Sequence, residues 1–434
     1  SVRHNEIVEV PMSEYQFIQY ANVRKAEIDQ DKNRKSNKKG KQKKTNKDTI
    51  FEPKSSYRAY SRMHCSFVFP ESIERPLPVS KTMAMEKVGE ALEQIQELQT
   101  DEMDENYAMV DTDSDDKIDM KKHIKAYETA RTKALKDLYD QREEYLIINN
   151  PEKLDKYAPK YNVIINKINK INGLAFVYTE YKTMEGIAIL SLVLKANGYA
   201  EFKLKKNSTG EYVLDENDED KDKPKYAFWA GSEEQSDLLR KIYNNEFNEL
   251  PTTLRKQLED QNATNLRGKV IKVLLTTKTG AEGIDLKNVR QVHIVEPYWN
   301  PVRLQQVKGR AIRVGSHLEL PPKDRLVDIY VYLATILPKH KKTEPIIERD
   351  SDGISSDQAL FKLSNKKLEI MKTLLKMIKE VSIDCSLNIN DTYEAEDPFT
   401  CLNYGSSLVD YSYIPNINDE YEDNPDGVQN LQLF

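Results

Sequence analysis

Cysteines and long apolar runs are scarce in this sequence, and both shortages exclude classes of protein. The three cysteines among 434 residues, Cys65, Cys385 and Cys401, lie far apart and are odd in number, so we expect a reducing compartment and no disulfide framework. None of them has a CxxC partner and the six histidines are dispersed, which argues against a metal site. The richest apolar run, residues 186–194, is about half of the roughly 20 residues that span a bilayer, so we expect no membrane partner.

The length and composition of the chain fit a large soluble protein. A chain of 434 residues can bury a sizeable core in two or three structural units. Charged residues make up 31% and apolar residues 38%, a balance typical of a soluble protein with solvated insertions. The sequence begins at Ser1 without a methionine and shows no signal peptide, so we expect a fragment of a longer protein.

The net charge of −6 is unevenly distributed, because two segments each carry mostly one sign. Residues 31–48 hold nine Lys or Arg against two Asp and no apolar side chain, which predicts a disordered basic insertion. This insertion is either a solvated loop or a non-specific tether for nucleic acid. Residues 101–119 are acidic, and we expect a solvated, disordered loop there, because they lack the glycine and glutamate positions of a calcium-binding loop.

Short apolar runs alternate with helical patterns through the second half of the chain. Residues 7–28 predict a strand followed by an amphipathic helix, and residues 122–171 predict charged helices. Near-continuous apolar strands separated by helices then predict an α/β fold whose parallel sheet is covered on both faces. The expected strands lie at 174–179, 226–231, 271–277, 292–297 and 326–333, with helices at 186–198 and 233–247 and an acidic hairpin at 201–224.

These patterns divide the chain into four parts. Residues 1–75 form a lead-in segment with the basic insertion, and residues 76–157 form a charged, mostly helical insertion. Residues 158–345 form the sheet-containing lobe, and residues 346–434 form a helical extension with an acidic tail. In that extension SSDQALFKL and NKKLEIMKTLLKMIKEV predict a pair of helices, and the first begins with the spacing of a capping box, Ser355 and Gln358.

The most unusual segment is QQVKGRAIRVGSH at 305–317, which holds three cations and no acid. Asn300 and Pro301 predict a helix start just before it. A helical projection then predicts two adjoining stripes. The apolar stripe, which would dock on the sheet, contains Leu304, Val307, Ala311 and Val314, and the polar stripe contains Arg303, Gln306, Arg310 and Arg313. Such an arginine row is either a solvated face with salt bridges or a site for an anion such as phosphate.

The segment before this helix favours the anion site. A strand is expected to end at TTKTG, and Gly280 and Gly283 follow with GxxG spacing. Glycines there allow positive φ angles and close approach of the backbone to a ligand. Asp285 comes next, shortly before a second expected strand.

Together these motifs resemble a known family. TTKTGAEGIDL, EPYWNP and QQVKGRAIRVG resemble motifs V and VI of superfamily 2 helicases, close to Swi/Snf-type DNA translocases, and LAFVYTEYK resembles motif IV. The flanks, SSYRAYSRMHCSFVFPESIERPLP and SSDQALFKLSNKK, are similar to helicase-like proteins of large cytoplasmic DNA viruses, the group of the poxvirus-type early transcription factor small subunit and nucleoside triphosphatase I. The resemblance implies that the lobe is the second RecA-like lobe of such an ATPase.

One departure from the family limits what this chain can do alone. Neither a GxxxxGK[ST] loop nor an acidic DExx box is found in the sequence. The resemblance therefore implies that ATP and its Mg²⁺ are held by a first lobe that precedes Ser1, and that the chain by itself is inactive.

The resemblance also implies roles for individual residues. Arg310 and Arg313 would reach the triphosphate, one of them as an arginine finger, while Gln306 would help place the nucleotide and the attacking water. Asp285 would contact the ribose or a motif VI arginine, unless it is only a local cap. Gly283 and Gly309 belong to the same nucleotide-facing set. The expected contacts to DNA phosphates are Thr277, Lys278 and Gly280, with Thr179 as a weaker candidate, and the alternative for Lys278 is a solvated lysine.

The implied partners are double-stranded DNA, the first RecA-like lobe and a viral RNA polymerase or transcription factor subunit. The resemblance places the protein in the virion and the host cytoplasm. The intact protein would then be a DNA-dependent ATPase or translocase acting in viral transcription. The alternative is a non-catalytic interaction module, a degenerate helicase lobe that docks polymerase or nucleic acid.

Overall fold

The structure is a computed structural model, and it describes residues 2–38, 58–76, 114–182, 184–229, 232–262, 264–277, 284–343, 353–382, 385, 400–402 and 428–429. The chain divides into two compact units, Ser1–Phe361 and Lys362–Phe434. The helices are α1 Glu14–Lys38, α2 Ala59–His64, α4 Ser114–Asp140, α5 Arg142–Tyr145, α6 Leu154–Tyr157, α7 Pro159–Lys170, α8 Ile187–Ala196, α9 Glu233–Tyr243, α10 Thr252–Gln261, α12 Pro301–Ala311, α13 Pro338–Thr343 and α15 Ser356–Glu380. The strands are β1 Val2–Pro11, β2 Leu174–Tyr178, β3 Ala200–Glu201, β4 Leu204–Lys206, β5 Tyr212–Leu214, β6 Lys225–Phe228, β7 Val273–Thr276, β8 Val289–Ile294, β9 Leu326–Thr335, β10 Cys401–Leu402 and β11 Val428–Gln429.

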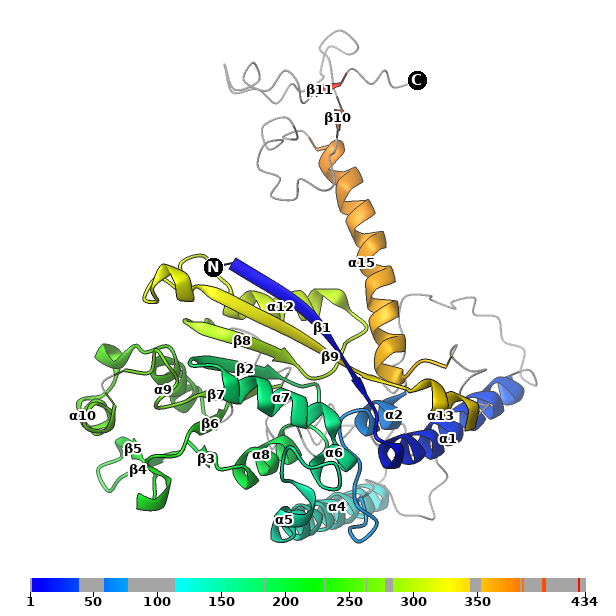
Figure 1. The fold of residues 1–434 in the computed structure, drawn as a ribbon, viewed down its shortest axis with the longest axis horizontal. Coiled ribbons are helices and arrows are strands. Elements are labelled where there is room, and N and C mark those ends of the chain that lie inside the picture. Colours follow the sequence, from blue (N-terminus) through cyan, green and yellow to red (C-terminus); the bar gives the residue numbers. More distant parts are fainter. Residues whose placement is uncertain are drawn as a thin grey trace. The chain divides into compact units, whose positions relative to one another are not determined.

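A seven-stranded sheet organises the first unit, in the order β1-β9-β8-β2-β7-β6-β3 (Figure 1). Every neighbouring pair in it is parallel. The central strand β2 pairs with β7 on one side and β8 on the other, although these strands lie far apart in sequence. The predicted α/β fold with a parallel sheet is therefore confirmed.

Side chains of β2 alternate between two apolar cores, one on each face of the sheet. Ala175 and Val177 belong to the core that helices α7 and α8 complete. Leu174, Phe176 and Tyr178 belong to the core that α9, α10 and α12 complete. Because successive side chains of a strand point to opposite faces, a strand covered on both sides is apolar throughout. That burial explains why the sequence of β2 reads as one continuous apolar run.

The amino-terminal segment joins the same sheet. Strand β1 pairs with β9 along its whole length, from Val2 opposite Leu326 to Pro11 opposite Thr335. Helix α1 then follows as expected, but it extends to Lys38. The expectation of disorder is therefore wrong for residues 31–38, where Lys and Arg favour a helix despite the lack of apolar side chains. Residues 39–48 lie outside the described residues.

The charged region before the lobe is helical, as expected. Helix α4 begins at Ser114, so the expected disorder of the acidic segment is wrong for residues 114–119, while residues 101–113 lie outside the described part of the chain. The acidic insertion at 201–224 contains the predicted hairpin, in which β4 and β5 pair antiparallel. The first compact unit thus contains the first three of the four parts into which the sequence was divided, together with residues 346–361 of the fourth.

A group of buried polar and charged residues lies where α7, the end of β8 and the start of α15 meet. We call it the buried polar cluster, and it consists of Lys160, Asp357, Glu296 and Ser66. Lys160 Nζ donates to Asp357 Oδ2 at 2.6 Å and to the Val295 carbonyl at 3.1 Å. Ser66 Oγ donates to Glu296 Oε1 at 2.8 Å. Burial alone lowers the pKa of Lys160, but the carboxylates of Asp357 and Glu296 outweigh it and raise that pKa.

The start of α15 is anchored at this cluster by the predicted capping box. Ser355 N donates to Gln358 Oε1 at 3.1 Å, and Gln358 N donates to Ser355 Oγ at 3.1 Å. The backbone N–H of Ala334, at the end of β9, donates to Asp357 Oδ2 at 3.0 Å. The expected pair of helices is instead the single helix α15, because no glycine or proline interrupts residues 356–380.

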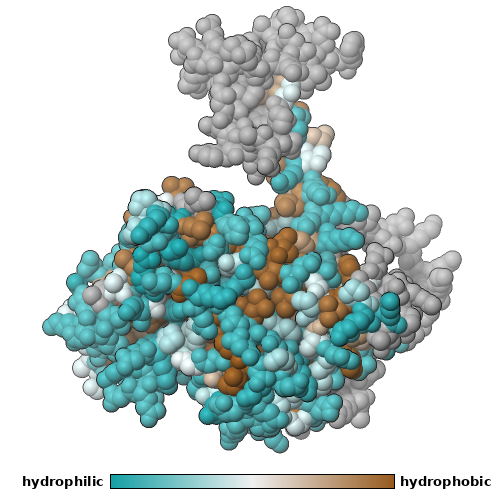
Figure 2. All heavy atoms as spheres, in the orientation of Figure 1, coloured by the Kyte–Doolittle hydropathy of each residue, from teal (hydrophilic) through white to brown (hydrophobic). Residues whose placement is uncertain are grey.

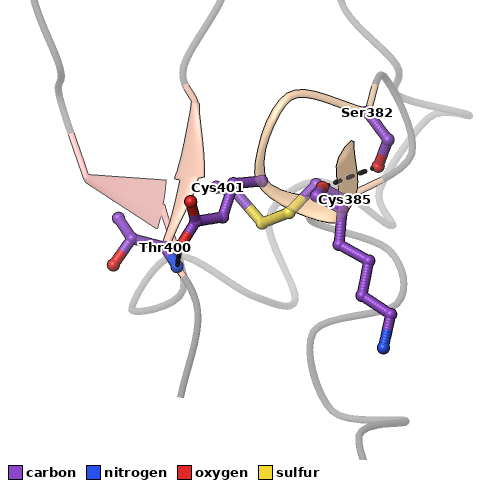
Figure 3. The surroundings of a disulfide bond; sticks show 6 residues. Ser382, Cys385, Thr400 and Cys401 are labelled. Carbon is purple, nitrogen blue, oxygen red and sulfur yellow. Dashed lines mark hydrogen bonds between the residues drawn. A yellow bond between two sulfur atoms is a disulfide. The ribbon is translucent and has the colours of Figure 1, made fainter. Parts of the chain in front are cut away.

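The second unit contains most of α15 and a disulfide bond between Cys385 and Cys401 (Figure 3). Cys401 begins β10, which pairs with β11. Near the disulfide, Thr400 N donates to Glu380 Oε1 at 3.3 Å. The expectation that the chain forms no disulfide is therefore wrong, and with it the reason for a reducing compartment. Spacing in the sequence did not reveal the pair, because 16 residues separate the two cysteines.

Polar side chains dominate the face of the first unit that Figure 2 presents. Among the described residues, no helix combines the length and the apolar character needed to cross a membrane.

Candidate functional site

Helix α12 begins where its capping residues predict. The side chain of Asn300 accepts a hydrogen bond at 3.0 Å from the backbone N–H of the second helical residue, and Pro301 occupies the first position. Three residues of the predicted apolar stripe, Leu304, Val307 and Ala311, are buried in the core on this face of the sheet. The helix therefore docks on the sheet as the sequence predicted.

The same helix ends earlier than the arginine pattern requires. Ile312 has a φ of −131° and leaves the helix, and Gly315 has a φ of +80°, a left-handed conformation that favours glycine. The expectation that Val314 continues the buried stripe is wrong, because its side chain is fully exposed. Arg313 also lies beyond the helix, so it does not share a helical face with Arg310.

Two backbone hydrogen bonds and one side-chain contact hold the end of this helix and the residues after it against the residues before β8 and at its start. Leu286 N donates to the Arg310 carbonyl at 3.2 Å, and Asn288 N donates to the Ser316 carbonyl at 2.9 Å. His317 Nε2 lies 2.7 Å from the Val289 carbonyl. These contacts bring the arginines to the segment that follows the predicted glycine loop.

Arg313 forms an ion pair with Asp285, the residue directly before Leu286 in that segment. The two side chains are 47% and 55% exposed, so a ligand can reach the pair. Gln306 is exposed on the same helix, and a side chain added at Gly309 would meet nothing within 4 Å. We call Arg310, Arg313 and Asp285 the arginine end of α12. Its surface is open, cationic and close to a carboxylate that can orient one guanidinium.

The opposite end of α12 carries a second charged contact, which the sequence analysis missed. Arg303 Nη1 donates to Glu180 Oε2 at 3.1 Å, and its guanidinium lies 3.9 Å from the centre of the Tyr298 ring. Glu180 also accepts a hydrogen bond from the Tyr178 hydroxyl at 2.7 Å. Burial would lower the pKa of Arg303, but Glu180 outweighs it and raises that pKa.

A protein-family model matches the segment that contains the arginine end. Residues 213–315 match the helicase conserved C-terminal domain. Residues 213–315 are therefore similar to a helicase C-terminal domain. This segment includes Asp285, Gln306, Gly309, Arg310 and Arg313, and with them the motifs V and VI that the sequence suggested.

Relatives of the helicase C-terminal domain and its flanks come from viruses. A protein of Acanthamoeba polyphaga mimivirus named as an ATP-dependent RNA helicase is 26% identical over 438 residues, which cover 93% of this chain and 46% of the relative. The African swine fever virus protein named termination factor NPH-I homolog is 40% identical over 124 residues, which cover 29% of this chain and 17% of the relative. The expected resemblance to helicase-like proteins of large DNA viruses is confirmed.

The chain spans less than half the length of these two relatives. Among solved structures, the C-terminal part of the Fun30 ATPase domain covers 86% of this chain and 98% of its own, with 12% identity and a TM-score of 0.38.

The remaining predicted residues of the helicase C-terminal domain lie at the end of β7. Thr277 follows this strand and is half-buried. Lys278, Gly280 and Gly283 lie outside the described residues.

Thr179, at the end of β2, has a different place from the one expected. It is buried, its N–H donates to the Thr276 carbonyl, and its Oγ accepts from Tyr181 N at 3.2 Å. In this position the hydroxyl stabilises the turn after β2 and is not exposed at the surface, where a DNA phosphate would lie.

The described part of the helicase C-terminal domain offers cations and hydrogen-bond donors for an anion. The same described residues include no group of three or more His, Cys, Asp or Glu side chains that could hold a metal. Arginine forks bind phosphate oxygens in two places at once and keep their charge at any physiological pH. The chemistry that this arrangement can support is therefore the stabilisation of a polyphosphate or of the charge that develops on it.

Proposed function

We propose that this chain is the second RecA-like lobe of an ATP-hydrolysing translocase of helicase superfamily 2. In this proposal a first lobe holds ATP and Mg²⁺, and the chain alone does not hydrolyse ATP. The arginine end completes the site from across the cleft. Duplex DNA is the nucleic acid, and the intact protein serves viral transcription in the virion and the host cytoplasm beside a viral polymerase or transcription factor subunit.

The observation that carries this proposal is the arginine end itself. Arg313 is oriented by Asp285 yet remains about half exposed, an arrangement suited to a ligand from outside the lobe. Arg310 lies in the last turn of α12, and the contact of its carbonyl with Leu286 N fixes its backbone. A guanidinium that a carboxylate orients, as Asp285 orients Arg313, can stabilise charge on the transferring phosphoryl group with little reorganisation during the reaction.

Other residues have supporting roles in this proposal. The exposed Gln306 helps to orient the nucleotide and the attacking water, and Asp285 holds Arg313 or contacts the ribose. Gly309 and Gly283 leave room for the nucleotide to approach. Thr277, Lys278 and Gly280 contact the DNA backbone, so binding should weaken steeply with salt and depend little on base sequence.

The test uses the full-length protein with ATP and duplex DNA. We expect Arg310→Ala or Arg313→Ala to lower DNA-stimulated ATP turnover by roughly 10³-fold, the scale of arginine-finger losses. Arg→Lys should restore little, because an ammonium group cannot reproduce the planar fork. Arg255→Ala is the control, since Arg255 lies on α10 in an exposed pair with Glu259 at 2.7 Å.

Three outcomes would contradict the proposal. Unchanged turnover in both arginine variants would exclude the finger, and equal loss in the Arg255 control would point to a general effect of removing a cation. Binding of duplex DNA without any ATP hydrolysis by the full-length protein would favour the alternative, a non-catalytic interaction module.

A further inference from the structure

The ion pair between Arg303 and Glu180 ties the amino-terminal end of α12 to the strand β2. Arg303 Nη1 and Glu180 Oε2 are 3.1 Å apart, and the two side chains are only 21% and 9% exposed. Burial distinguishes this pair from ordinary surface salt bridges, which contribute little because water screens them. Each partner also has a second contact, Arg303 with the Tyr298 ring and Glu180 with the Tyr178 hydroxyl.

The buried polar cluster also holds the backbone of Glu180. Its backbone N–H donates to Glu296 Oε2 at 3.1 Å, and Glu296 Oε1 accepts from Ser66. Burial raises the pKa of Glu296, whereas Lys160 and these hydrogen bonds act in the opposite direction. The carboxylate that Arg303 meets therefore belongs to a residue whose backbone is bonded to a fully buried carboxylate.

The geometry of α12 connects this pair to the arginine end. Arg310 follows Arg303 by seven positions, and at 1.5 Å per residue the two lie about 10 Å apart along one uninterrupted helix. A helix of this length moves as one body, so a change of angle at its first turn displaces its last turn. At the far end, Arg310 is held by a backbone contact to Leu286, and Arg313 by a half-exposed carboxylate.

We propose that Glu180 and Arg303 are positioning residues that set the angle of α12 and thereby place Arg310 and Arg313 for catalysis. The inference rests on the proposed function, because it acts through those arginines. Neither positioning residue touches the nucleotide. Removing the pair leaves the arginines present but misplaced, and a displacement of about 1 Å at a reacting group can cost on the order of 100-fold in rate.

The experiment compares Arg303→Met and Glu180→Gln in the full-length protein, with ATP hydrolysis measured in the presence of duplex DNA. Methionine keeps apolar bulk over Tyr298 and removes the charge. We expect kcat to fall by roughly 10- to 100-fold with the KM for ATP changed less than about threefold, because the loss concerns the transition state. Arg303→Lys should recover part of kcat, since lysine retains the charge that pairs with Glu180.

A closely matched control lies on α9. Arg240 Nη1 and Glu246 Oε2 are 2.9 Å apart and 24% and 10% exposed, and Arg240 belongs to α9 instead of α12. Arg240→Met should shift the melting temperature about as much as Arg303→Met while leaving kcat within about twofold of the unmodified protein. The double variant Glu180→Gln with Arg303→Met should be no slower than the slower single variant, because both changes break one interaction.

The outcomes separate this inference from the proposed function. If Arg310→Ala abolishes turnover but Arg303→Met and Glu180→Gln do not lower it, the positioning role is wrong and the proposed function stands. Equal loss of kcat in Arg240→Met would also overturn the inference, because stability alone would then explain the effect. If the unmodified full-length protein does not hydrolyse ATP, the proposed function fails and the positioning role fails with it.

Discussion

The buried polar cluster and the arginine end hold similar side chains under opposite conditions. In the cluster, Lys160 and Asp357 are almost completely buried and bonded to each other. At the arginine end, Arg313 and Asp285 form a comparable pair but stay about half exposed. A charge removed from water must be paired inside the chain, whereas a half-exposed charge keeps most of its hydration and can exchange partners. The difference separates charges that the fold requires from charges that the fold leaves accessible.

The largest expected effect on stability is at the buried polar cluster. Lys160→Met should lower the free energy of unfolding of this chain by about 3–5 kcal/mol, because it leaves the carboxylate of Asp357 buried without its cation. Urea-induced unfolding followed by circular dichroism would measure the loss. Arg313→Ala, by comparison, should cost less than about 1 kcal/mol.

A second substitution checks the cause of that loss. Lys160→Met combined with Asp357→Asn removes both charges and should recover part of the stability, since no unpaired charge then remains buried. If Lys160→Met and Arg313→Ala have equal effects on unfolding, the contrast between the two regions is wrong.

An intermediate effect is expected from acid acting on another buried side chain. His293 lies 2.8 Å from the Tyr332 hydroxyl and 3.0 Å from Gln291 Oε1, and burial followed by the charge of Lys167 lowers its pKa to about 3. Between about pH 6.5 and pH 3, His293 is therefore neutral in the folded protein and protonated in the unfolded chain. This contribution to stability is fully present above pH 6.5 and is lost as the pH falls towards 3, by about 1 kcal/mol per pH unit.

Chemical denaturation at several pH values between 4 and 7 would measure that slope. His293→Gln keeps a hydrogen-bonding side chain that does not titrate, so the slope should become shallower by about one proton. His317 beside the arginine end contributes with the same sign, because burial also lowers its pKa. An unchanged slope in the variant would assign the acid sensitivity to other groups.

The smallest expected effect has the opposite sign and lies beside the arginine end. Gly309→Ala places a methyl group where nothing lies within 4 Å, and alanine favours a helix over glycine by up to about 1 kcal/mol. We therefore expect a slightly higher melting temperature of the chain, together with lower ATP turnover of the full-length protein if the nucleotide approaches here. A lower melting temperature would show that the glycine serves the packing of α12 and not an approaching ligand.

Much of the fold follows from local patterns in the sequence. The apolar runs predicted the central strands, Asn300 and Pro301 predicted the start of α12, and Ser355 with Gln358 predicted the start of α15. These signals are readable because each depends on residues within one or two turns of each other. The same patterns failed at Val314, because a helical projection does not show where the helix ends, and at Cys385 and Cys401, whose spacing carries no signal of pairing.

The sequence by itself determined that an α/β lobe would carry a cationic segment after a glycine-containing loop, with motifs typical of a helicase. Only the tertiary structure decided which carboxylates meet those cations. Glu180 lies 123 residues from Arg303, and Asp357 lies 197 residues from Lys160, yet each pair is in contact. The edges of a parallel sheet bring together segments from across the whole chain, so these pairings depend on strand order and helix docking, which no local spacing encodes.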